Sequence, residues 1–222
     1  MAAVEYRGLL PEDADALGAI LGVTWHADEV GEDGGEAAAG GDAASSRAEL
    51  AQQLYGLVDF AQYAQRHTFA QVAVMGGKPV GVVMARAGKA DAATQNRWKS
   101  VADDACQRLA ALGQDLEEFD AFFRAMDEVD VQLLAESGCD ERFELVLFAV
   151  GPETRGHGVG TKLLATAQDY LREQGARQAF LFTDTDCTWE YYEHRGMRRA
   201  AERAFAPGEL LPEGMFVYEM QL

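Results

Sequence analysis

The sequence predicts an α/β fold built on a mixed β-sheet, within a single domain of residues 1–222. Two apolar, β-rich runs, 69–75 and 80–87, flank the turn "GGKP" and predict an antiparallel hairpin. A strand, a helix and another strand follow one another over 142–184, which predicts a right-handed parallel crossover. Because these two connections need different strand directions, the sheet should contain parallel and antiparallel neighbours.

The first part of the chain should form one strand and two helices. A weakly alternating strand is expected at 4–10, and Pro11 with the acids after it suits the start of a helix. The segment 28–46 is rich in Gly and Ala and carries six acids but no base, which predicts a flexible acidic loop. Apolar residues at helical spacing predict a second helix over 47–66, with Ser46 as its N-cap.

The remaining elements follow from similar patterns. Residues 91–137 carry two apolar stripes of helical period, and Gly113 marks the break between two helices. An apolar strand is expected at 142–150, then the glycine stretch "RGHGVG" at 155–160, then a helix that ends near Gly175. The chain should end with a strand at 177–184, a short helix at 187–197, and strands at 198–205 and 215–222.

Charge and cysteine content exclude several classes of function. The chain has 37 acidic and 19 basic residues, and its net charge of -18 repels the phosphate backbone of nucleic acids. Its three cysteines are far apart and show no Cys/His ligand spacing, so we expect no metal and a reducing compartment. The longest apolar run, 145–150, is too short for a bilayer, and the N-terminus lacks the apolar core of a signal peptide. We therefore expect a cytoplasmic protein without nucleic-acid or membrane partners.

The stretch "RGHGVG" places glycines at positions 156, 158 and 160, directly between a strand and a helix. Exposed backbone N–H groups at a helix N-terminus attract an anion, and the helix dipole adds roughly half a positive charge. The spacing is not the GxGxxG of dinucleotide folds, and the Gly-Lys-Ser/Thr of a P-loop is absent. An ordinary glycine-rich turn is the alternative to an anion site.

The segment 145–175, "LVLFAVGPETRGHGVGTKLLATAQDYLREQG", resembles the central motif of the GNAT superfamily of N-acetyltransferases, R/Q-x-x-G-x-G/A after a strand ending V-x-P. The segment 189–197, "WEYYEHRGM", resembles the family's FYxxxGF segment, with Tyr192 at the tyrosine position. Residue 185, often Asn in the family, is Thr185 here, which puts one coenzyme contact in doubt. The resemblance implies a GNAT-like acyl-CoA N-acyltransferase fold with a helical insertion, 91–140, between the third and fourth strands.

The same resemblance implies acetyl-coenzyme A as cosubstrate, bound by a core at 142–197. The diphosphate would meet backbone amides of the glycine stretch, and the pantetheine arm would pair with the preceding strand. His157 is by itself more typical of a solvent-facing residue than of a catalyst. The residues that the resemblance implies for coenzyme binding are Phe148, Val150, Arg155, Gly156, His157, Gly158, Val159, Gly160 and Thr161.

Acetyl transfer to an amine needs a base for the ammonium, donors for the tetrahedral oxygen and an acid for the thiolate. Glu144 is the predicted base, because a carboxylate at the start of an apolar strand should have a raised pKa. The segment "ELVLFAV" is also similar to the segment of family members that use a glutamate at this position. The alternative is an ion pair with an arginine such as Arg142, with Glu141 or a water relay as substitute base. The resemblance implies Tyr192 as the acid, with a packed core tyrosine as the alternative.

The acceptor is predicted from charge alone. Residues 1–140 carry 24 acidic and 10 basic residues, against 13 and 9 in 141–222. An acidic acceptor side would concentrate a cationic amine, although surface solubility explains the same charge. We therefore expect transfer from acetyl-coenzyme A to a primary amine of a small molecule or peptide, with an acyl-CoA-binding sensor as the alternative. The oligomeric state, a homodimer included, stays open.

Overall fold

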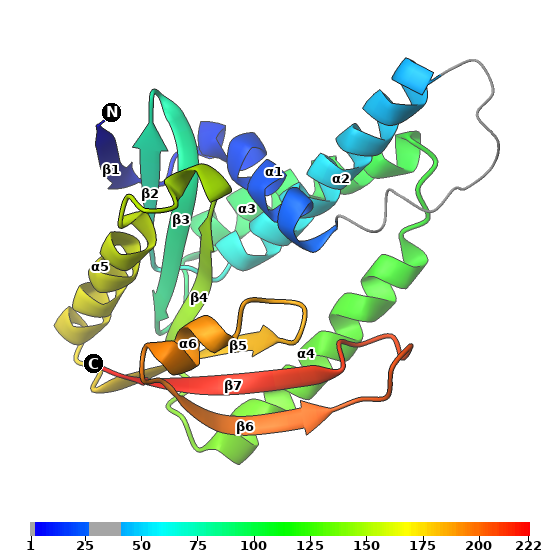
Figure 1. Ribbon diagram of the computed structural model, residues 1–222. Coiled ribbons are helices and arrows are strands. Elements are labelled where there is room, and N and C mark those ends of the chain that lie inside the picture. The colour runs from blue at the N-terminus through cyan, green and yellow to red at the C-terminus, as the bar shows by residue number, and fades with distance from the viewer. Residues whose placement is uncertain (1–2, 27–40) are drawn as a thin grey trace.

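The computed structural model describes residues 3–26 and 41–222. Strands and helices follow the predicted order along the chain (Figure 1). They are β1 (Val4–Gly8), α1 (Ala14–Trp25), α2 (Gly41–Ala64), β2 (Phe69–Met75), β3 (Lys78–Ala87), α3 (Ala92–Ala111), α4 (Glu117–Ser137), β4 (Phe143–Val150), α5 (Val159–Glu173), β5 (Gln178–Asp184), α6 (Glu190–His194), β6 (Arg198–Ala204) and β7 (Gly214–Gln221).

The strands form a seven-stranded sheet in the order β1-β2-β3-β4-β5-β7-β6. Only β4 and β5 are parallel neighbours in the described sheet, and every other pair is antiparallel. The predicted mixed sheet, the hairpin of β2 and β3 and the parallel crossover through α5 are therefore confirmed. The parallel pair lies in the middle of the sheet, where the chain crosses from its first half to its second.

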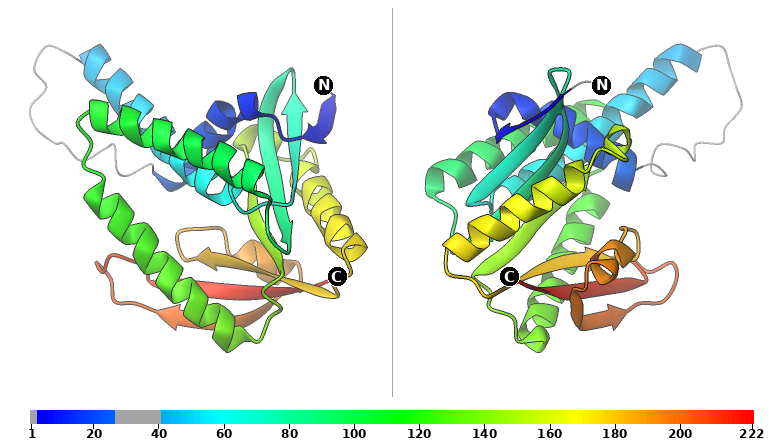
Figure 2. Two further views of the ribbon diagram at one scale, coloured as in Figure 1. Left: turned by 180° about the vertical axis from the view of Figure 1, so that it is seen from behind. Right: turned by 60° about the vertical axis from the view of Figure 1, so that its left-hand side comes forward.

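Alternate side chains of the strands enter hydrophobic clusters on opposite faces of the sheet. On what we call the α2 face, Val72 and Val74 pack with residues of α1, α2 and α3. On the opposite face, called the α5 face, Ala73 and Val83 pack with residues of α5. Helix α4 covers the strands of the second half, where Val129 packs with residues of β5 and β7. The two views of Figure 2 show α5 and α6 on one side and α3 and α4 on the other.

Two helices, α3 and α4, lie between β3 and β4, where the sequence predicts helices over 91–140. The break between them contains Gly113, whose φ of 74° lies in the left-handed region that glycine tolerates. Asp91 caps α3, because its carboxylate accepts the backbone N–H of Thr94 at 2.9 Å. None of the helices within 3–26 and 41–222 is long and apolar enough to cross a membrane.

Two predicted boundaries were wrong. Helix α2 begins at Gly41, so residues 41–46 are helical rather than part of an acidic loop, and Ser46 lies inside the helix instead of capping it. The rest of the predicted loop, up to residue 40, lies outside the described residues. Helix α6 starts at Glu190, later than predicted, because the Asp184 carboxylate accepts the backbone N–H groups of residues 186 and 187 and holds that segment in a turn.

Candidate active site

The glycine stretch forms a compact turn between β4 and α5. The hydroxyl and the amide of Thr154 both donate to the carbonyl oxygen of Gly151, at 2.7 and 3.0 Å, which fixes the turn as it leaves the strand. Gly156 and Gly158 have φ angles of 76° and 68°, so a side chain at either position would strain the backbone. The backbone amide of His157 donates to the Thr154 carbonyl, and its exposed ring lies 2.9 Å from the Arg155 carbonyl oxygen, as expected for a solvent-facing histidine.

Several backbone amides at this turn point to no acceptor. Within the described chain no backbone or side-chain acceptor is found for the amides of residues 156 and 158–161, and Lys162 is the first to donate into the helix, to Gly158 at 3.0 Å. No acidic side chain lies in the first turn of α5 to satisfy them. The Arg195 guanidinium donates to the Thr161 hydroxyl at 2.7 Å and adds a positive charge beside the helix start. The arrangement suits an anion with several oxygens.

Strands β4 and β5 diverge from a single point of pairing. Their ladder contains one pair, Glu144 with Phe180, whereas β4 pairs with β3 from Phe143 to Val150. We call the space between the diverging strands β4 and β5 the wedge. Figure 1 shows that the two strands lie close together near the start of β4 and are farther apart toward the glycine turn. Beyond Glu144 the edge of β4 therefore lacks β5 as a ladder partner and can receive an extended ligand as an added strand.

A β-bulge in β4 divides its side chains between the two faces. Ala85 pairs with Leu145 and Met84 with Leu147, so Val146 is the extra residue. After the bulge Phe148 packs on the α5 face, where its ring lies 5.6 Å from the Tyr191 ring. A Cβ at Gly160 would come within 3.2 Å of Phe148 Cζ, so glycine allows the helix start to approach the strand. Val150, the last strand residue, is 37% exposed at the wide end of the wedge.

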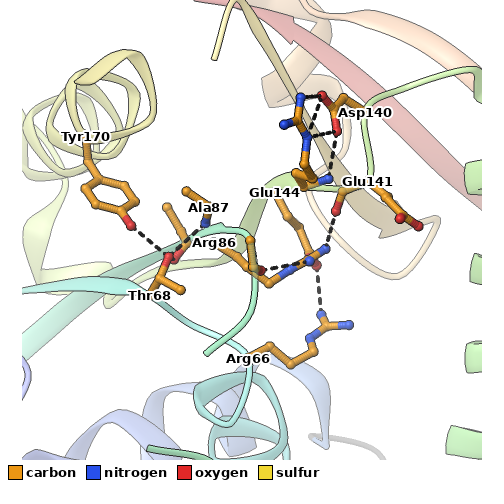
Figure 3. A network of polar contacts seen from close by, with 11 residues as sticks. Arg66, Thr68, Arg86, Ala87, Asp140, Glu141, Glu144 and Tyr170 are labelled. Carbon is orange, nitrogen blue, oxygen red and sulfur yellow. Dashed lines mark hydrogen bonds and ion pairs between the residues drawn. The ribbon is translucent and has the colours of Figure 1, made fainter. Parts of the chain in front are cut away.

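Glu144 lies before the bulge, on the α2 face, at the narrow end of the wedge. Its carboxylate is buried and accepts from Arg86 Nε at 2.7 Å, and the guanidinium of Arg66 lies 2.9 Å from its other oxygen (Figure 3). Val150 lies six positions beyond Glu144, about 20 Å along an extended strand. Arg142, the partner considered from the sequence, pairs instead with Asp140 at 2.6 Å. Both arginines are far from Glu144 in sequence, so no local pattern could have indicated them.

Tyr192 lies in α6 on the α5 face of the wedge. Its ring is 5.8 Å from that of Tyr218, and burial raises its pKa, with the negative charge of Asp184 adding to the shift. The Tyr192 hydroxyl therefore keeps its proton at neutral pH. Burial also raises the pKa of Cys187 to about 12, so this thiol stays protonated and is no nucleophile.

The predicted site residues therefore form two groups. One group lies on the α5 face at the wide end of the wedge and consists of Phe148, Val150 and the glycine turn. Tyr192 lies on the same face. Glu144 lies on the opposite face at the narrow end. A ligand that reaches from the turn into the wedge would pass from one group toward the other.

Comparisons with known proteins identify the family and the fold. A model of the acetyltransferase (GNAT) family matches residues 42–197, more than half of the chain. Among solved structures, a GCN5-related N-acetyltransferase from Rhodopseudomonas palustris is 16% identical with a TM-score of 0.51, and covers 100% of this chain and 98% of its own. Ard1 from Thermoplasma volcanium is 12% identical with a TM-score of 0.51, at 99% and 98% coverage. These structures show the fold. No curated protein matches the chain.

Proposed function

The chain belongs to the acetyltransferase (GNAT) family, and from this premise we propose that it moves the acetyl group of acetyl-coenzyme A directly to a primary amine of a small molecule or peptide. As a member of that family it is an acyltransferase. The acceptor and the chemical steps within the wedge are the proposed part.

The observation that carries the proposal is the wedge between β4 and β5 with unpaired amides at its open end. The amides of residues 158–161 and the dipole of α5 would hold the diphosphate of the coenzyme, and Arg155 and Arg195 add positive charge nearby. The backbone of Phe148 and Val150 would pair with the pantetheine arm in place of the missing β5 ladder. A main-chain N–H of this edge would also bind the thioester oxygen as negative charge develops.

The amine must lose a proton before it attacks. For an alkyl ammonium with a pKa near 10.4, deprotonation at pH 7 costs about 4–5 kcal/mol, so a positioned base matters. Glu144 is the predicted base, and because both of its oxygens contact arginines it would act through a water relay. Tyr192 would donate a proton to the departing thiolate, and its place on the α5 face, beside the ring of Tyr191 that contacts Phe148, supports this role.

The experiment is a release assay for free thiol from acetyl-coenzyme A with a panel of primary amines. The wild-type protein should release thiol with at least one amine, and Glu144→Gln and Tyr192→Phe should each lower the rate by about 100-fold or more. Unchanged rates in both variants would remove these two assignments. Binding of acetyl-coenzyme A without turnover on any amine would instead favour the acyl-CoA-binding sensor.

A further inference from the structure

A cavity of about 290 Å³ lies on the α5 face, beside the start of α5. It is lined by α5, by the turn that follows α6 and by the end of β7, rather than by the two strands of the wedge. Its lining includes Thr161, Leu164 and Gln168 from α5, Arg195 from the turn and Met220 from β7. The volume is close to the lower limit of about 300 Å³ for pockets that bind small molecules, so it can hold one part of a larger ligand.

The inner surface of this cavity is apolar. Leu164, Met197 and Met220 line it, are buried, and belong to the hydrophobic cluster of the α5 face. Thioether and aliphatic side chains pack favourably against the face of an aromatic ring. The cavity therefore suits a planar heterocycle whose faces are apolar and whose edge is polar.

An amide side chain with few hydrogen bonds lies at this apolar surface. Gln168 Nε2 donates to Met220 Sδ at 3.1 Å, and within residues 3–26 and 41–222 its side chain makes no other hydrogen bond. A thioether is a weak acceptor, so this contact satisfies the amide poorly. A glutamine amide pairs well with the edge of an adenine, because each of the two groups offers one donor and one acceptor. Gln168 is therefore suited to bind an adenine edge.

An arginine is held in place where the cavity approaches the glycine turn. The Arg195 guanidinium donates to the Thr161 hydroxyl at 2.7 Å and lies 5.0 Å from the centre of the Tyr191 ring. In the described part of the chain no carboxylate pairs with it, and Glu193, two positions earlier, is already paired with Arg199 at 2.7 Å. A positioned guanidinium without an acidic partner is well suited to bind a phosphate group.

The cavity begins where the proposed diphosphate site ends. Thr161 belongs to both, because its backbone amide is one of the unpaired amides at the start of α5 and the residue also lines the cavity. Gln168 lies seven residues further along the same helix, about 10 Å away. The diphosphate of coenzyme A joins the pantetheine arm to a 3′-phosphoadenosine. When the arm enters the wedge, the nucleoside must lie on another side of the turn, and the cavity is on the page as that place.

We infer that this cavity binds the 3′-phosphoadenosine half of coenzyme A, with Arg195 on the 3′-phosphate and the Gln168 amide on the edge of the adenine. The inference rests on the coenzyme site of the proposed function. The adenine ring packs against the buried side chains of Leu164 and Met220. The donor that this site selects is a thioester of free coenzyme A. A phosphopantetheine arm attached to a carrier protein has the same thiol but no nucleoside to fill the cavity.

The test is calorimetry with three ligands that lose these groups in turn. Dephospho-coenzyme A lacks the 3′-phosphate of coenzyme A, and 4′-phosphopantetheine lacks the nucleoside as well. The wild type should bind coenzyme A about 10-fold or more tightly than dephospho-coenzyme A, and 4′-phosphopantetheine most weakly. Arg195→Gln should weaken coenzyme A by about 10-fold and change dephospho-coenzyme A much less. Gln168→Leu should weaken both nucleoside ligands by a similar factor, roughly 3- to 10-fold, and leave 4′-phosphopantetheine unchanged.

Arg124→Gln is the matched control for the loss of one positive charge. Arg124 is exposed on α4, which lies on the other side of the sheet from α5 and α6 (Figure 2). This variant should bind all three ligands as the wild type does. Circular dichroism and unchanged binding of 4′-phosphopantetheine check that the Arg195 and Gln168 variants fold.

Equal affinity of the wild type for coenzyme A and dephospho-coenzyme A would overturn the role of Arg195, and so would an equal loss of both ligands in Arg195→Gln. An unchanged affinity of Gln168→Leu for both nucleoside ligands, or 4′-phosphopantetheine bound as tightly as dephospho-coenzyme A, would overturn the adenine site. The proposed acetyl transfer stands in each of these cases. Tight binding of coenzyme A without turnover on any amine would overturn the transfer and leave this site, whereas no affinity for coenzyme A would overturn both.

Discussion

The ion pairs of Glu144 depend on residues that lie far from it in the sequence. Its place on a buried strand could be predicted from the apolar run that follows it. Its partners could not, because Arg66 and Arg86 come from the end of α2 and from β3 and meet it only when the sheet forms.

Glu144→Gln should lower the stability of the protein as well as its activity. The change leaves the guanidinium groups of Arg66 and Arg86 without a charged partner around a buried side chain. Because both arginines are partly exposed, we expect the free energy of unfolding to fall by about 1–3 kcal/mol, measured by urea denaturation.

The matched control is Asp140→Asn, which breaks the exposed ion pair with Arg142. That pair should contribute less than about 1 kcal/mol. If Glu144→Gln were no more destabilising than Asp140→Asn, the two arginines would not depend on the carboxylate as described.

At the scale of the elements, helices α1 and α2 pack closely because glycines lie where their backbones meet. A Cβ built at Gly56 would lie 2.2 Å from the backbone oxygen of Gly18 and 2.2 Å from the backbone nitrogen of Gly22. The helices were predictable from their apolar spacing, but the glycine contact was not, since it requires knowing which faces meet. The late start of α6 likewise depends on the turn that the Asp184 side chain imposes.

Gly56→Ala should therefore destabilise the fold despite the higher helix propensity of alanine. The added methyl group must push the helices apart, and we expect a loss of about 1–3 kcal/mol in the free energy of unfolding. Gly8→Ala is the control, because a Cβ there meets no atom within 4 Å. A Gly56→Ala protein as stable as the wild type in thermal or urea unfolding would show that α1 and α2 do not pack this closely.

At the scale of the whole molecule, all seven strands belong to one sheet, but β4 and β5 in its middle are paired at a single point. The mixed strand directions followed from local patterns, but the strand order, the bulge at Val146 and the single point of contact between β4 and β5 did not. These depend on pairing between segments far apart in the chain, which a local pattern does not encode. The division places the glycine turn and Phe148, which we propose to bind the coenzyme, on one face and Glu144 on the other, and this arrangement connects the fold with the proposed reaction.

The central claim is that unpaired amides between β4 and α5 hold the diphosphate of coenzyme A, and calorimetry tests it most directly. The wild type should bind coenzyme A and should bind pantetheine, which lacks the diphosphate, far more weakly. Gly158→Ala should weaken coenzyme A binding, while Gly208→Ala, at an equally open left-handed glycine in the loop between β6 and β7, should leave it unchanged. No affinity for coenzyme A, or equal affinity for pantetheine, would contradict the account.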